Sequence, residues 1–95
     1  MSRPILSDAD RADVFRGLAH PTRRRLLRTL GDGEATVGQL LAGLRLTMPA
    51  LSQHLRVLRE AGLVVHRVIG HQRVYRRNVT SMRRACRWLE QNGAA

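Results

Sequence analysis

The chain has 95 residues, the length of one small domain, and this leaves no room for two independent hydrophobic cores. It carries 17 basic residues, every one an arginine, against 7 acidic residues, which gives a formal net charge of +10. A field of that sign favours a polyanionic partner such as nucleic acid. A membrane surface is the rival polyanion, but the sequence lacks a long basic amphipathic helix with bulky apolar anchors. A GC-rich genome would explain the choice of Arg over Lys, though not the net charge.

The single cysteine, Cys86, excludes an intramolecular disulfide and fits a reducing compartment. The first twenty residues contain no apolar run of signal-peptide length, and no stretch approaches a membrane span. We therefore expect a cytoplasmic protein that makes no membrane contact. The acidic residues are scattered, and the chain has neither a Gly-rich phosphate loop nor a Ser/His/Asp set, so we do not expect an enzyme.

Residues 1–95 are predicted to form a single domain, with residues 1–6 as a flexible arm. A cap in residues 7–10 begins a first helix that runs to about Ala19. Residues 20–22 break that helix, and a second helix begins at Pro21 and ends in the Gly-Asp-Gly turn at 31–33. The arginines around the second helix face either DNA phosphate or solvent, and the sequence leaves both open: Arg23, Arg24, Arg25 and Arg28.

A third, short helix is predicted to begin after Thr36 as its N-cap. Its apolar set follows helical spacing: Val37, Leu40, Leu41 and Leu44. A three- or four-residue turn then leads into another helix, and this pairing is typical of a helix-turn-helix.

That next helix, predicted over residues 47–61, is the recognition helix of the pattern. Thr47 can cap it, Pro49 fits its first turn, and Gly62 follows its last turn as a left-handed residue. An apolar stripe faces the core: Leu51, Leu55 and Leu58. The opposite face is polar and cationic, which suits the DNA major groove: Met48, Ser52, Gln53, Arg56 and Arg59. Taken alone, the stretch also fits an ordinary amphipathic surface helix.

After Gly62 the pattern changes to β-branched and aromatic residues, which predicts strands over 63–69 and 72–77 with a turn at Gly70-His71. Neither face of this hairpin is cleanly apolar, so its register stays open. Asn78 or Thr80 caps a last helix that runs to about Gln91. The predicted fold is mainly α with a small β-hairpin, a winged helix-turn-helix of order α-α-α-α-β-β-α, with the hairpin as the wing.

Three segments of the sequence resemble ArsR/SmtB-type bacterial repressors. Residues 18–24 (LAHPTRR) resemble the opening of that family's second helix. Residues 47–64 (TMPALSQHLRVLREAGLV) are close to its recognition-helix signature, and residues 70–75 resemble its basic wing. The resemblance covers roughly residues 11–90. MarR-type winged helices are the nearest confusable group, but they are usually longer.

The resemblance implies a homodimeric repressor that binds a two-fold operator and is released by a signal, with the first and last helices at the dimer interface. The interface residues that follow are Phe15, Met82, Ala85, Cys86 and Leu89. Cys86 is expected as a buried interface thiol, with a redox sensor as the alternative.

Metal-sensing members of the family carry paired cysteines on the third helix or Asp/His ligands on the last, and this chain departs from both patterns. Residues 34–40 contain no cysteine, and the last helix offers only Cys86 and Glu90 as ligand-type residues. Because zinc takes three or four N, S or O ligands, we expect no metal and no cofactor. His54 is expected as a wedged, hydrogen-bonded structural histidine, and His20 as a helix cap.

Candidate DNA contacts come from the two helix starts and the wing. Thr36 and Thr47 hold phosphates through their hydroxyls and backbone N–H groups, or act as caps and nothing more. Gln53 is expected on a base edge with Ser52 beside it, Arg56 on phosphate, and Met48 against a thymine methyl or filling a gap. Arg73, expected at the wing tip, is assigned to the minor groove or to phosphate, with His71 adding a contact. The weaker wing candidates are Arg67, Arg76 and Arg77.

The sequence therefore predicts a dimeric, sequence-specific transcriptional repressor that binds double-stranded DNA at a pseudo-palindromic operator. The 47–61 helix would enter the major groove, and the wing over 64–77 would meet the flanking groove. Two alternatives stay open: a winged-helix protein-interaction module, and a constitutive DNA binder without an effector. The sequence names no effector and no operator.

Overall fold

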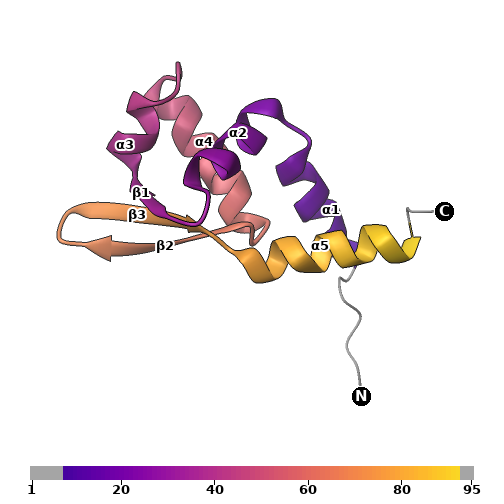
Figure 1. Ribbon diagram of the computed structural model, residues 1–95. Coiled ribbons are helices and arrows are strands. Elements are labelled where there is room, and N and C mark those ends of the chain that lie inside the picture. Colours follow the sequence, from indigo (N-terminus) through magenta and orange to yellow (C-terminus); the bar gives the residue numbers. More distant parts are fainter. Residues whose placement is uncertain (1–7, 93–95) are drawn as a thin grey trace.

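The structure, a computed structural model, describes residues 8–92, with side chains described from residue 13 onward. The expected arm over residues 1–6 and the cap at Ser7 lie outside this range. Five helices and three strands follow one another along the chain (Figure 1). They are α1 (Asp8–Leu18), α2 (Pro21–Leu30), β1 (Glu34–Thr36), α3 (Val37–Ala42), α4 (Met48–Glu60), β2 (Val64–Ile69), β3 (Gln72–Arg77) and α5 (Val79–Asn92).

The predicted winged-helix fold class is confirmed, but the predicted element order lacked one strand. β1 pairs antiparallel with β3 and makes the wing a three-stranded sheet of order β1-β3-β2. The linker after α3 is also longer than expected, because α3 ends at Ala42 and residues 43–47 separate it from α4. Asn78, and not Thr80, caps α5, since its side-chain Oδ1 accepts from the Ser81 backbone N–H at 3.4 Å.

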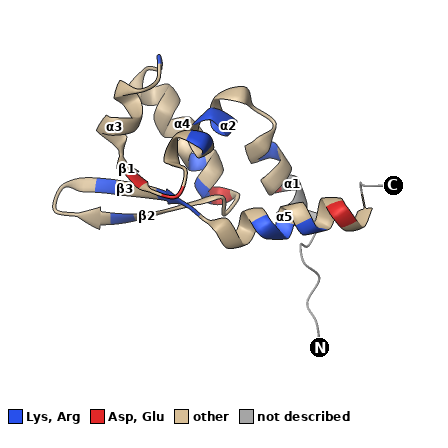
Figure 2. Ribbon diagram, viewed as in Figure 1, with Lys and Arg blue, Asp and Glu red and all other residues tan. Residues whose placement is uncertain are grey.

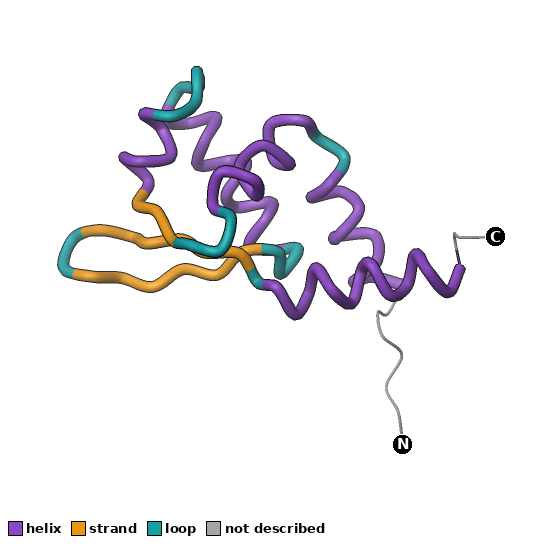
Figure 3. The backbone as a smooth tube through the Cα atoms, viewed as in Figure 1, coloured by secondary structure: helices purple, strands orange, loops and turns teal. Residues whose placement is uncertain are grey.

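Helices α2 to α4 lie above the sheet, and the tip of the hairpin projects beyond them at one end of the molecule (Figures 1 and 3). Helix α5 runs below α1 at the other end. The core lies between these layers and is made almost wholly of leucine and valine. Its fully buried side chains are Leu26, Leu40, Leu51, Leu58, Leu63 and Val64. The apolar stripe of the recognition helix therefore packs on a close-packed core.

Helix α4 begins and ends as its sequence predicts. The Thr47 hydroxyl accepts from the Ala50 N–H at 3.3 Å, which satisfies one of the first-turn donors. At the other end Gly62 adopts φ +73°, and the Leu63 N–H donates to the Leu58 carbonyl at 2.9 Å. This is the left-handed helix ending that glycine makes possible. It turns the chain directly into β2.

Two of the arginines on α2 have a structural role that the sequence left open. Arg23 donates from Nε to the Gly17 carbonyl at 3.1 Å and from a terminal nitrogen to the Arg16 carbonyl at 2.7 Å. Arg24 donates to the Leu18 carbonyl at 2.7 Å. Both guanidinium groups therefore satisfy carbonyls in the last turn of α1, where the helix dipole also favours positive charge.

Candidate nucleic-acid interface

The outer face of α4 presents the side chains that the sequence assigned to DNA bases. Ser52 and Gln53 are exposed, and Met48 is 46% exposed although it is apolar. Leu51, Leu55 and Leu58 on the inner face are 0–3% exposed, so the helix cannot rotate without losing its core contacts. The packing thus fixes which side chains face outward.

Arg56, also on the outer face, is held by a carboxylate one turn further along. Its Nε lies 2.9 Å from Oε1 of Glu60, and both side chains are more than half exposed. An exposed pair at i, i+4 is weak, so a phosphate group can displace the carboxylate.

Thr36 joins the wing sheet to the helix-turn-helix. It is the last residue of β1, paired with Val74 of β3, and it is also the N-cap of α3. Its hydroxyl accepts from the Gln39 N–H at 3.1 Å, and the Gln39 side-chain Oε1 accepts from the Thr36 N–H at 2.8 Å. This reciprocal capping box fixes the first turn of α3 directly beside the wing.

The wing hairpin turns at Gly70, which has φ +61°. Within residues 8–92, every residue with a positive φ is a glycine. A positive φ at the first central residue alone fits the predicted type II′ turn. The register that the sequence left open pairs Val68 with Arg73 and Ile69 with Gln72. Tyr75, two residues after Arg73, is 3% exposed and belongs to the core.

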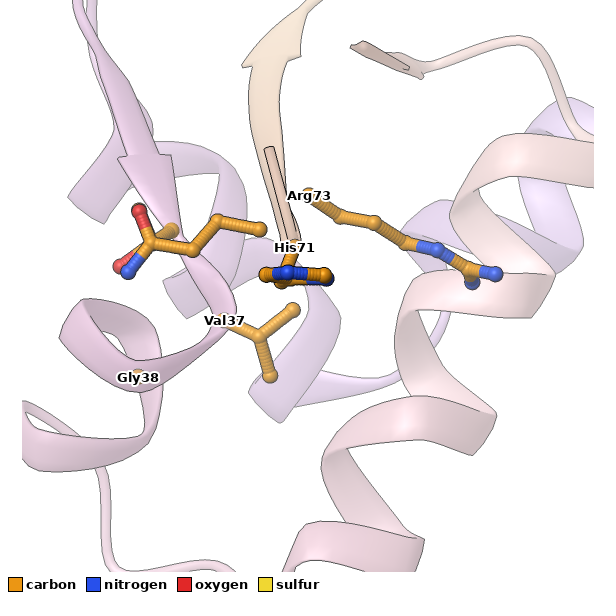
Figure 4. Close-up of a pocket in the computed structure, with 6 residues that line it drawn as sticks. Val37, Gly38, His71 and Arg73 are labelled. Atoms are coloured by element: carbon orange, nitrogen blue, oxygen red, sulfur yellow. The ribbon is translucent and has the colours of Figure 1, made fainter. Parts of the chain in front are cut away.

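Arg73 was expected at the wing tip, and it lies next to the tip as the second residue of β3, paired with Val68. Strand residues two apart share a face, so Arg73 continues the core-facing side of β3 beyond Tyr75. Figure 4 shows its side chain extending away from His71 and toward α4. The tip itself carries His71 and Gln72, both exposed, and no arginine.

Two concavities meet at Arg73. The larger, of about 320 Å³, lies between the N-terminus of α3 and the wing tip, lined by Thr36, Val37, Gly38, His71, Gln72 and Arg73 (Figure 4). The smaller, of about 210 Å³, lies between α4 and β3, lined by Val37, Ser52, Leu55, Arg56, Arg59, Arg73 and Tyr75. Val37 and Arg73 line both, so the structure brings Thr36, Ser52, Arg56, His71 and Arg73 together around one surface.

Arg59 is the residue that the sequence prediction undervalued. It was placed on the outer face of α4 without being assigned a contact, yet it lines the smaller concavity with Arg56 and Arg73. The signal was its spacing, because Ser52, Arg56 and Arg59 follow i, i+4 and i+7 and so share one face.

Two of the weaker wing candidates form ion pairs with acidic residues in β1 and just before it. Arg67 bonds to Glu34 Oε1 at 2.6 Å, and Arg77 bonds to Asp32 Oδ1 at 3.0 Å. Figure 2 shows arginine along α4, the wing and α5, with fewer acidic positions among them. These two pairs tie β2 and β3 to the segment around β1 and leave Arg73 as the wing arginine that faces α4.

His54 was expected to be hydrogen-bonded, and this was wrong for one ring nitrogen. Its Nδ1 is buried without a hydrogen-bond partner, and its ring lies 4.6 Å from that of His20 between centroids. Burial, and then the nearby His20 and Arg23, lower the pKa of His54. His20 caps α2 as predicted, since its Nδ1 accepts from the Thr22 N–H at 3.1 Å.

The residues assigned to a dimer interface differ in how exposed they are in the single chain. Ala85 is 3% exposed and packs in the chain's own core, which leaves it almost no surface for a partner. Phe15 and Met82 are half-buried, with the Phe15 ring 5.5 Å from that of Trp88 in an edge-on arrangement. Cys86 is exposed in the single chain, and Leu89 is 44% exposed.

Within residues 8–92 no group of three or more His, Cys, Asp or Glu side chains is placed to hold a metal ion. The helices of this same range include none with the length and apolar character needed to cross a membrane.

Comparison with known proteins identifies the fold and its relatives. Residues 18–67 match the family model of a helix-turn-helix domain. The chain is 49% identical over 65 residues to the biofilm growth-associated repressor of Agrobacterium fabrum, covering 68% of this chain and 56% of that protein. It is 42% identical over 73 residues to the HTH-type transcriptional regulator Rv2034 of Mycobacterium tuberculosis, covering 77% of this chain and 66% of the relative. The match thus spans less than two thirds of the length of either curated relative.

Among solved structures, the ArsR-like transcriptional regulator from Rhodococcus sp. RHA1 superimposes with a TM-score of 0.84 at 31% identity. That superposition covers 90% of this chain and 79% of the other. These relatives are regulators of transcription and not enzymes. On this sequence and structural similarity, the chain belongs to the ArsR family of winged helix-turn-helix transcriptional regulators.

Proposed function

We propose that this chain is a homodimeric transcriptional repressor that reads a pseudo-palindromic DNA operator. Helix α4 enters the major groove, and the wing meets the flanking backbone or groove. The observation that carries the proposal is the exposed polar and cationic face of α4, which lies on the same side of the molecule as Arg73 and the α3 N-terminus. Side chains that donate to bases and to phosphates are thus grouped on one surface.

Base recognition is assigned to Gln53 and Ser52, with Met48 against a thymine methyl group. The Gln53 side chain is exposed, and no hydrogen bond to another described residue engages it. A glutamine amide can pair with both edge atoms of adenine in the major groove, which the serine hydroxyl cannot do. The repressor role is supported by the name of the Agrobacterium relative.

Dimerisation is supported by the surface of α5. Leu89 is 44% exposed, Val79 is 41% exposed and Cys86 is exposed, whereas Met82, Ala85 and Trp88 of the same helix pack in or against the core. Two-fold operators place half-sites about one DNA turn apart, and a two-fold dimer matches that spacing. Cys86 would then lie within or beside the contact between subunits.

The deciding experiment is selection of the purified protein on a randomised duplex pool, together with binding to bulk DNA at two salt concentrations. A two-fold motif that is enriched and still bound at physiological salt is the expected result. Binding that disappears with salt and enriches no motif would leave only charge, and would favour the protein-interaction alternative.

The contact assignment is tested with Gln53→Ala on the selected motif. We expect affinity to fall by about 1–3 kcal/mol, the range for a good base contact, with the circular dichroism spectrum unchanged. Unchanged affinity would remove Gln53 from the interface. Zinc and cadmium are expected to leave operator affinity unaltered, and stoichiometric metal that releases the DNA would reveal a site that the sequence did not suggest.

A further inference from the structure

Three arginines from two separate segments of the sequence converge on the smaller concavity between α4 and β3. Arg56 and Arg59 reach it from the helix, and Arg73 reaches it from the strand. We call this surface the arginine groove. All three side chains belong to exposed residues, whereas the groove floor is formed by half-buried Val37 and the buried Leu55 and Tyr75.

The convergence follows from backbone geometry and not from a chance rotamer. Ser52, Arg56 and Arg59 share one face of α4 by their spacing, and the buried Leu51 and Leu58 hold that face toward the wing. On the strand, Tyr75 is anchored in the core, and Arg73 must therefore point to the same side of the sheet.

The charge within the groove is not balanced. None of the residues that line it is acidic. Glu60, one turn beyond Arg56, pairs with Arg56, and no ion pair within the described residues engages Arg59 or Arg73. Three guanidinium groups around a polar hydroxyl, Ser52, make a site for an oxyanion, since each can donate two parallel hydrogen bonds.

We infer that the arginine groove holds a backbone phosphate of the DNA strand that passes between the recognition helix and the wing. Arg59 and Arg73 then set affinity and salt dependence but not sequence preference. The assignment rests on the proposed function and revises the role of Arg73. From the core-facing side of β3, Arg73 binds the DNA backbone between the helix and the wing. The tip of the wing carries no arginine but has Ile69, 52% exposed, beside His71, and this tip meets the flanking groove.

The test uses the full chain with Arg59→Gln, Arg73→Gln and the double variant. Arg84→Gln is the matched control, because Arg84 is exposed on α5 and its loss changes the net charge equally. Binding to the selected motif and to a random-sequence duplex is measured by fluorescence anisotropy over a series of salt concentrations. Melting curves check that each variant is folded.

Each groove variant is expected to weaken both duplexes by the same factor, roughly three- to tenfold at low salt, and to leave the motif preference unchanged. The slope of log affinity against log salt should fall by about one for each arginine removed, while Arg84→Gln leaves it nearly unchanged. A loss of motif preference in Arg73→Gln would show base or minor-groove reading and overturn the inference, as would slopes equal to the control.

Two further arms separate this inference from other outcomes. Inorganic phosphate, compared with chloride at equal ionic strength, should compete no better; specific competition would mark the groove as a site for a free anion and contradict the assignment. If the wild-type protein enriches no motif, the repressor proposal fails. In that case the arginine groove is tested on bulk DNA alone. The assignment holds if the slopes of log affinity against log salt for the Arg59 and Arg73 variants are lower than that of the control, and it fails if the slopes are equal.

Discussion

At the scale of single residues, Arg56 is engaged before any DNA arrives. Its Nε contacts Glu60 at 2.9 Å, so a phosphate must displace a carboxylate to reach it. We predict that Glu60→Gln tightens DNA binding at low salt by about two- to fivefold, the worth of an exposed pair, and that the gain vanishes at high salt. Glu90→Gln on α5 is the control for lost charge, since Glu90 is also exposed. Equal effects of the two substitutions would mean that the ion pair has no role.

His54 makes stability depend on pH. Its folded-state pKa lies below the ordinary value of 6.5 because of burial and, after that, the nearby His20 and Arg23. Below that pH the unfolded chain binds a proton that the folded chain does not, so protonation favours unfolding. The contribution is complete above pH 6.5 and is lost as the pH falls below it.

We therefore predict that the melting temperature falls on acidification through this range, and that His54→Gln makes the fall shallower. Thermal melts of both proteins above and below pH 6.5 measure it. Parallel curves for wild type and variant would contradict this role of His54.

At the scale of elements, Gly17 lets α1 approach the end of α4 closely. A Cβ added there would lie 2.7 Å from Leu63 Cδ1, and Leu63 is 0% exposed, so its side chain must shift within a packed core. Alanine is the better helix former by about 1 kcal/mol, but overpacking a core typically costs about 1–3 kcal/mol. We predict that Gly17→Ala lowers the free energy of unfolding by about 1 kcal/mol.

Gly38 in α3 is the matched comparison, because a Cβ there meets nothing closer than the Thr36 hydroxyl at 3.9 Å. Gly38→Ala should raise stability by about 0.5 kcal/mol through helix propensity alone. Urea unfolding of both variants measures whether each substitution lowers or raises the free energy of unfolding. A stabilised Gly17→Ala protein would show that Leu63 repacks and that the helix contact is looser than the structure indicates.

The helices could be predicted from sequence because their signals are local. Thr47, Pro49 and Gly62 mark the ends of α4 within its own stretch, and the leucine spacing gives its buried face. β1 could not be predicted, since it is three residues long and exists through its pairing with residues 74–76, some forty positions away. No periodicity can be read from three residues.

The same limit explains why the orientation of Arg73 could not be predicted. The direction of its side chain depends on the hairpin register, which pairs it with Val68, and both faces of the hairpin mix apolar and charged residues. The buried Tyr75 decides which face is inner, but burial of Tyr75 requires the tertiary contact with the helices. The ion pairs of Arg67 and Arg77 are likewise non-local.

At the scale of the whole molecule, α5 carries exposed apolar residues that a second subunit would cover. We predict that Leu89→Glu shifts the protein toward a monomer, because a charge replaces a side chain that is 44% exposed in the single chain and buried in the proposed dimer. Light scattering coupled to gel filtration measures the mass.

Val68→Glu on the wing is the control, since Val68 is 64% exposed and the substitution adds the same charge far from α5. It should leave the oligomeric state unchanged. A Leu89→Glu protein that stays dimeric would place the contact between subunits on another surface.

The dual position of Thr36 has a mechanical consequence. One residue ends a strand of the wing and starts the first turn of α3, and nothing flexible lies between them. The wing and the helix-turn-helix are therefore expected to move together as one rigid unit. A signal that acts on either element is expected to move the other element with it. If the proposed dimer responds to a signal, that signal is expected to change the distance and angle between the two subunits rather than the shape of either one.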